Sequence, residues 1–296
     1  VGLAINANSS LSANVAGTWN INGDLGVSGL GTSSFGGVAN LTITGNVTVS
    51  GTTQLWFNTT INGFTLNGGT LNTGAITFPG VVSLNSNIST LNWLSGTINL
   101  TNSNVTIGFV NAPGTTNFLS NLILTTGQTL NITGANAFLH ANHGNIDVNG
   151  GTLTDLTGQF ASAGGFISTF ESNGTASFGG GILDNPGGTI NILTGASVTS
   201  GLFSITNSTT NGTLSGTMLV NSATLLVNAN ATLGGTTGNS TSYATLNLQS
   251  AANATFTSNL TIKNFGLLNL SGGSLTANAI QINSGGILYQ NGGNLT

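Results

Sequence analysis

The stretch GLLNLSGGSLTANAIQINSGGILYQNGG, residues 266–293, contains one complete structural repeat and the start of the next. Short runs that alternate apolar with polar residues fall at Gly266–Leu270, Ser274–Thr276, Ala279–Ile282 and Ile287–Tyr289. An alternation with period two is typical of strands with one buried face. Glycine pairs separate these runs and allow the positive φ that tight corners need. Three short strands and three corners in about twenty residues predict one coil of a triangular β-helix.

The same alternation recurs along the chain, for example at Leu41–Thr44, Val47–Val49, Ile98–Leu100 and Leu246–Leu248. Helical spacing of apolar residues is absent, and the helix formers Glu and Lys occur once each. Trp19, Trp56 and Trp93 are 37 residues apart, as are Gly150 and Gly187, and we interpret 37 as two coils. The sequence predicts an all-β, right-handed parallel β-helix of about 14–16 coils of roughly 18–21 residues. Residues 1–296 form a single β-solenoid domain in this interpretation, which leaves open that the chain is part of a longer one.

Composition restricts the function. Charged residues make up 2% of the 296 residues, with Lys263 as the one basic residue and no Arg. Nucleic-acid binding needs Lys and Arg to neutralise phosphates, so this class is excluded. No apolar stretch reaches the ~18 residues of a membrane-spanning helix, so we expect no membrane span. A surface this poor in charge favours association.

Two segments carry a resemblance to a known family. Leu268-Asn269-Leu270-Ser271-Gly272-Gly273-Ser274-Leu275-Thr276 and Asn149-Gly150-Gly151-Thr152-Leu153-Thr154 resemble the repeats of autotransporter passengers and of filamentous-haemagglutinin-like proteins of bacterial surfaces. The likeness extends loosely over most of the chain. It implies a right-handed parallel β-helix, secretion to the outside of the cell or its surface, and roles in adhesion or surface layers.

Asn-x-Ser/Thr sequons are dense, and each is a candidate N-glycosylation site in an exported chain. They begin at Asn8, Asn40, Asn46, Asn58, Asn87, Asn99, Asn104, Asn131, Asn173, Asn207, Asn211, Asn230, Asn239, Asn253, Asn259, Asn269 and Asn294. The alternative is that they arise from the abundance of Asn, Ser and Thr. Attached sugars would replace the missing charges as a solubilising coat.

Catalytic and metal sites are not expected. His140, His143 and Asp147 are the one cluster of metal-ligand type, but a third nitrogen or sulfur ligand is missing. Paired carboxylates cleave polysaccharides, yet the five acidic residues have no Arg beside them. We therefore predict no enzyme, no cofactor and no metal ion. The cluster Phe160, Phe166, Phe170 and Phe178 is expected to pack in the core.

The ends of the chain suggest self-association. Neither terminal segment carries capping charges, and an open solenoid edge invites pairing with another strand. We predict an extracellular subunit of a surface fibre or sheath that associates with itself head to tail by β-strand addition. The expected assembly edges are Val1, Leu3, Ile5, Leu288 and Leu295. Two alternatives remain: an adhesin stalk that binds glycans or other cell-surface material, and an ice-binding solenoid. Regular Thr-x-Thr columns would mark the ice-binding solenoid, and runs such as Thr42-Ile43-Thr44 look too irregular in the sequence for it.

Overall fold

The structure is a computed structural model of the 296-residue chain. It describes residues 3–5, 18–21, 25–28, 33–34, 40–43, 47–50, 55–56, 64–73, 77–78, 91–101, 104–107, 115–118, 121–134, 138–141, 144–156, 158–163, 165–206, 215–235 and 242–296. Burial is described for most of these residues from 93 onward. The described residues form strands and turns and contain no helix.

The strands belong to three sheets. The eight-stranded sheet contains β13 (Leu122–Thr125), β16 (Ile146–Asn149), β19 (Ile167–Glu171), β21 (Thr189–Ile192), β23 (Thr217–Asn221), β26 (Ala244–Gln249), β28 (Gly266–Leu270) and β30 (Ile287–Gln290). The two-stranded sheet contains β4 (Ser33–Ser34) and β7 (Leu55–Trp56). The 21-stranded sheet contains β1 (Leu3–Ile5), β2 (Thr18–Ile21), β3 (Leu25–Ser28), β5 (Asn40–Ile43), β6 (Val47–Ser50), β8 (Phe64–Thr73), β9 (Thr77–Phe78), β10 (Leu91–Thr101), β11 (Asn104–Ile107), β12 (Thr115–Phe118), β14 (Gln128–Thr133), β15 (Phe138–Ala141), β17 (Thr152–Asp155), β18 (Gln159–Ser162), β20 (Thr175–Asp184), β22 (Ser197–Ile205), β24 (Thr224–Val227), β25 (Ala231–Leu233), β27 (Asn253–Ile262), β29 (Ser274–Ile282) and β31 (Asn294–Leu295).

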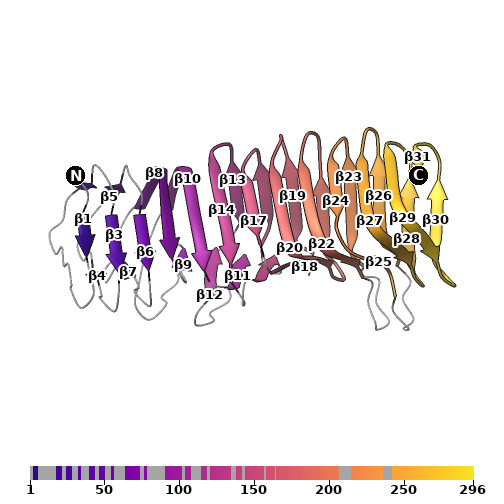
Figure 1. The fold of residues 1–296 in the computed structure, drawn as a ribbon, viewed down its shortest axis with the longest axis horizontal. Coiled ribbons are helices and arrows are strands. Elements are labelled where there is room, and N and C mark those ends of the chain that lie inside the picture. Colours follow the sequence, from indigo (N-terminus) through magenta and orange to yellow (C-terminus); the bar gives the residue numbers. More distant parts are fainter. Residues whose placement is uncertain are drawn as a thin grey trace.

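These strands stack as the coils of a parallel β-solenoid. Every pairing between the named strands is parallel, and coils follow one another in sequence order from the N-terminal to the C-terminal end (Figure 1). One ladder, here called the long ladder, runs the length of the described chain. It joins β1, β3, β6, β8, β10, β14, β17, β20, β22, β24, β27, β29 and β31. A third face carries β15, β18, the second halves of β20 and β22, β25, and the second halves of β27 and β29. The predicted β-helix is therefore confirmed, while its right-handed winding stays a prediction.

The predicted coil length is wrong. Register partners lie from 20 residues apart (Leu275 and Leu295) to 32 residues apart (Ile98 and Leu130). The thirteen strands of the long ladder therefore replace the predicted 14–16 coils among the described residues, and give a rod of about 58 Å. Backbone pairing fixes the register of the strands but leaves the corners free to take extra residues, so the sequence period varies.

The tryptophan spacing does not measure two coils. Trp19 pairs in register with Leu41, whereas Trp93 pairs with Leu66. Trp56 pairs with Ser34 in the separate two-stranded sheet. The three tryptophans therefore belong to different columns, and their equal spacing is a coincidence.

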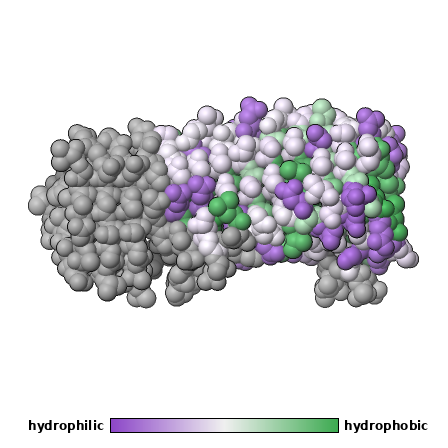
Figure 2. Space-filling model, in the orientation of Figure 1, coloured by the Kyte–Doolittle hydropathy of each residue, from purple (hydrophilic) through white to green (hydrophobic). Residues whose placement is uncertain are grey.

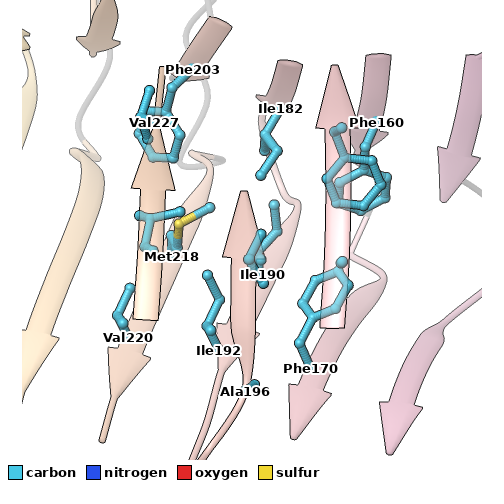
Figure 3. Close-up of a cluster of buried hydrophobic side chains, with 14 of the residues drawn as sticks. Phe160, Phe170, Ile182, Ile190, Ile192, Ala196, Phe203, Met218, Val220 and Val227 are labelled. Atoms are coloured by element: carbon cyan, nitrogen blue, oxygen red, sulfur yellow. The ribbon is translucent and has the colours of Figure 1, made fainter. Parts of the chain in front are cut away.

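Alternation divides each strand into an inner and an outer side. In β21, β23 and β26 every second residue is buried, and the residues between are half-buried. The outer side consists mainly of Thr, Ser, Asn and Gly, and pale colours of intermediate hydropathy cover much of the surface in Figure 2. Inner Leu, Ile, Val and Phe side chains form one continuous core. Figure 3 shows Ile182, Ile190, Met218 and neighbouring side chains pointing into it from facing strands.

Three phenylalanines of the predicted cluster lie in this core. Phe160, Phe170 and Phe178 are fully buried, and Phe166 is half-buried. The rings of Phe160 and Phe178 stack at 4.9 Å, and Phe170 meets Phe178 edge-on at 6.2 Å. The aromatic cluster is therefore a packing element rather than an exposed binding platform.

The corner inside β20 depends on glycine. Gly181 has a φ of 124°, and a β-carbon there would lie 2.4 Å from the carbonyl oxygen of Leu202. The register shifts at the same point, between Phe178 and Gly181. A glycine lets the strand turn from the long ladder onto the third face while the coils stay at backbone contact distance.

Candidate assembly edge and modification sites

The last coil has backbone partners on one side. β30 pairs with β28, and β31 pairs with the first half of β29. The second half of β29, Ala279–Ile282, pairs with β27 and with no later strand among the described residues. The outer backbone groups of this coil therefore form an open sheet edge, which can template a further strand.

The core is also uncovered at this end. Ile282 and Leu295 are 48% and 39% exposed, although both continue inner columns. One coil earlier, Ile262 and Leu275 in the same columns are fully buried. Apolar side chains gather at the C-terminal end of the surface in Figure 2.

The first described coil has a matching edge. β1 pairs with β3, and Leu3 is in register with Leu25. The inner column that contains Leu3 runs through the whole long ladder and ends at Leu295. Of the five predicted edge residues, the structure places Leu3 and Ile5 in the first strand, Leu288 in β30 and Leu295 in β31, while Val1 lies outside the described residues.

The described sequons differ in how accessible their amides are. Asn173, Asn230, Asn253, Asn259 and Asn294 are exposed. Half-buried sequon residues are Asn99, Asn131 and Asn269. Asn40 and Asn104 begin strands whose backbone alone is described. The sequons at Asn8, Asn46, Asn58, Asn87, Asn207, Asn211 and Asn239 lie outside the described residues.

Two half-buried sequons form asparagine ladders between coils. Asn131 Nδ2 donates to Asn99 Oδ1 at 2.9 Å, and Asn269 Nδ2 donates to Asn247 Oδ1 at 3.1 Å. A sugar would be attached at Nδ2, so Asn131 and Asn269 would have to break these hydrogen bonds to react. The exposed sequons, with Asn173 in a turn before β20, are the better acceptors.

The predicted metal-type cluster is not assembled. His140 lies on β15 and Asp147 on β16, which belong to different sheets, and His143 lies outside the described residues. Within the described ranges no group of three His, Cys, Asp or Glu side chains could hold a metal ion. Burial lowers the pKa of His140 and raises the pKa of Asp147.

The acidic residues do not form a catalytic pair. Asp147 points outward from β16, whereas Asp155 and Asp184 are fully buried in the core. Glu171 is half-buried on the outer side of β19, and its Oε1 accepts a hydrogen bond from Asn149 Nδ2 at 3.1 Å. No two of these four carboxyl groups share a register position or a printed hydrogen bond among the described residues.

Sequence analysis missed that two acids are buried. Asp155 Oδ1 accepts a hydrogen bond from the backbone N–H of Gly158 at 2.8 Å. Asp184 lies between Ser162 and Ile205 in its column, and burial raises its pKa well above the ordinary value, opposed by the backbone N–H of Thr217. Parity could have found both, since Asp155 is two residues from buried Leu153 and Asp184 two from buried Ile182.

The fold defines the chain as a parallel β-solenoid, and comparison adds no narrower class. No protein-family model, no curated protein and no solved structure matches the chain. The described residues also form no helix of the length and hydropathy that crossing a membrane requires.

Proposed function

We propose that the chain is an extracellular structural protein whose solenoids join head to tail by β-strand addition, as subunits of a surface fibre or sheath. The observation that carries this proposal is the open edge of the last coil, where inner-column residues stay exposed. The occupant of that edge is the first coil of a second copy. Leu3 of the incoming copy then continues the column that ends at Leu295.

The contact combines two kinds of interaction. Covering a half-exposed Leu or Ile contributes about 1 kcal/mol, and Ile282, Leu288 and Leu295 would all be covered. Each added backbone hydrogen bond contributes a further ~1 kcal/mol. Association has to offset a loss of translational and rotational freedom of at least ~4 kcal/mol. The joint is therefore expected to be concentration-dependent rather than permanent.

Surface chemistry favours a salt-insensitive joint. The described part of the last coil, residues 266–296, contains no charged residue. Screening acts on charges, so added salt would change the association little. A fibre outside the cell would meet varying ionic strength, and an uncharged joint suits that environment.

The test places charges on the edge. The variant Ile282→Lys with Leu295→Lys puts two cations on half-exposed edge residues, and Ile123→Lys with Leu202→Lys changes two side chains that are 54% and 51% exposed on lateral surfaces. Analytical ultracentrifugation over a concentration series and electron microscopy measure assembly. Circular dichroism checks that each variant is folded.

We expect the parent chain and the lateral variant to form filaments one solenoid wide, and the edge variant to stay monomeric. A parent chain that remains monomeric at high concentration would contradict the proposal. So would an edge variant that assembles like its parent, or filaments built by side-to-side contact.

A further inference from the structure

The outer side of the long ladder carries two aligned columns of short polar side chains. The first column contains Thr97, Thr129, Thr152, Thr175, Ser197, Thr224, Asn253, Ser274 and Asn294. The second contains Asn99, Asn131, Thr154, Ser177, Thr199, Leu226, Thr255 and Thr276. We call these two columns the hydroxyl face. All of its members are half-buried or exposed.

Backbone pairing makes the hydroxyl face a regular array. Neighbours within a column are one coil apart, about 4.8 Å, and the two columns are two residues apart along each strand, about 6.7 Å. Sheets held by coil stacking are flatter than free sheets, which twist. Hydrogen bonds along a column add order, such as Thr175 Oγ1 to Thr152 Oγ1 at 3.2 Å and Ser274 Oγ to Asn253 Oδ1 at 3.4 Å.

The array contains no charge. None of the members of the hydroxyl face is acidic or basic, and one apolar residue, Leu226, interrupts it. The outer side of the eight-stranded sheet is different, because Asp147 and Glu171 lie on it and exposed Ile123 and Ile167 interrupt its polar residues. The same solenoid thus provides a regular polar face and an irregular one.

We propose that the hydroxyl face binds ice. An array that repeats in two directions matches a partner that also repeats in two directions, and oxygen atoms on a prism face of ice repeat at spacings close to those of the two columns. Threonine suits such a surface, because its hydroxyl hydrogen-bonds to water while its methyl group fills the space between water positions. Charged groups would disturb the ordered water layer, and the face has none.

Other partners fit the face less well. Sugar rings stack on exposed aromatic side chains, and no member of the two columns is aromatic. A protein partner would be anchored by buried aromatic residues or Arg in a pocket, which a flat face of Thr, Ser and Asn does not offer. The most regular part, from Thr152 and Thr154 to Ser197 and Thr199, is the expected centre of contact.

A matched pair of substitutions tests the proposal. Thr175→Tyr introduces a bulky ring at the centre of the hydroxyl face, between Thr152 and Ser197. Thr217→Tyr makes the same change on the eight-stranded sheet, between Thr189 and Thr245. Both chains are labelled with a fluorophore and partitioned into slowly growing ice, and inhibition of ice recrystallisation is measured in parallel. The background carries Ile282→Lys with Leu295→Lys, so that head-to-tail association does not affect the comparison.

We expect the parent chain to be enriched in ice, Thr175→Tyr to lose most of that enrichment, and Thr217→Tyr to retain it. Exclusion of the parent chain from ice to the same extent as a non-binding protein would overturn the proposal, as would equal losses in the two variants. Binding to crystalline cellulose or chitin without enrichment in ice would also overturn it and assign the face to a polysaccharide. Thermal unfolding of both variants shows whether a loss comes from the surface or from the fold.

Discussion

Truncation of Phe178 to alanine should be among the most destabilising single changes in the core. The side chain is fully buried and contacts two other buried rings, Phe160 at 4.9 Å and Phe170 at 6.2 Å. A buried Phe→Ala change costs about 3–5 kcal/mol, and each aromatic pair adds ~1 kcal/mol beyond buried area. Loss of two pairs places Phe178→Ala near the upper end, at about 5 kcal/mol.

Phe256→Ala is the matched control. Phe256 is 1% exposed and has one ring partner, Phe203, at 5.7 Å. We expect it to cost ~1 kcal/mol less than Phe178→Ala, because it loses one aromatic pair fewer. Urea unfolding with an unchanged m value measures both losses. A loss below ~1 kcal/mol for Phe178→Ala, or a smaller loss than for Phe256→Ala, would refute the packing argument.

Two further changes test the buried acid and the corners. Burial raises the folded pKa of Asp184, so its contribution to stability is full below the unfolded value of 3.8 and is lost as the pH rises through the raised pKa. Asp184→Asn should therefore remove a decline in unfolding free energy between pH ~4 and 8, measured as urea midpoints across this range; an identical decline in parent and variant would count against a buried neutral carboxyl. His140, whose pKa is lowered, has the opposite slope in both proteins and cancels in the difference. Gly174→Ala should cost about 3 kcal/mol, because the added β-carbon would lie 2.3 Å from the carbonyl oxygen of Val148. In the control Gly165→Ala, where no heavy atom lies within 4 Å and φ is 85°, the backbone strain should cost about 1 kcal/mol; thermal and urea unfolding compare the two, and equal losses would show that coil contact does not limit the corner.

Local patterns predicted the strands well. The runs proposed for residues 266–289 correspond to β28, both halves of β29, and β30. They are readable because inner and outer side chains alternate with period two, and this alternation is local in the sequence. The same parity, applied to the acids, would have placed Asp155 and Asp184 in the core.

Coil length and candidate sites were less predictable. Equal spacing of tryptophans suggested a fixed period, but corners hold different numbers of residues, and Trp19 and Trp93 belong to different columns. Proximity in sequence also suggested a cluster of His140 with Asp147, which the corner between β15 and β16 places in different sheets. The sequons could be found by motif, yet only coil stacking reveals that the Asn131 and Asn269 amides are engaged in ladders.

The sequence by itself determined the all-β class, the parallel coils and the near absence of charge, because strand alternation and composition do not depend on distant residues. Tertiary structure alone decided which residues of successive coils are neighbours. Thr152, Thr175 and Ser197 form one column, although the next step in that column, from Ser197 to Thr224, is longer than the two before it. Backbone hydrogen bonding aligns the strands whatever the length of the corners, so a face that looks irregular in the sequence is regular in space.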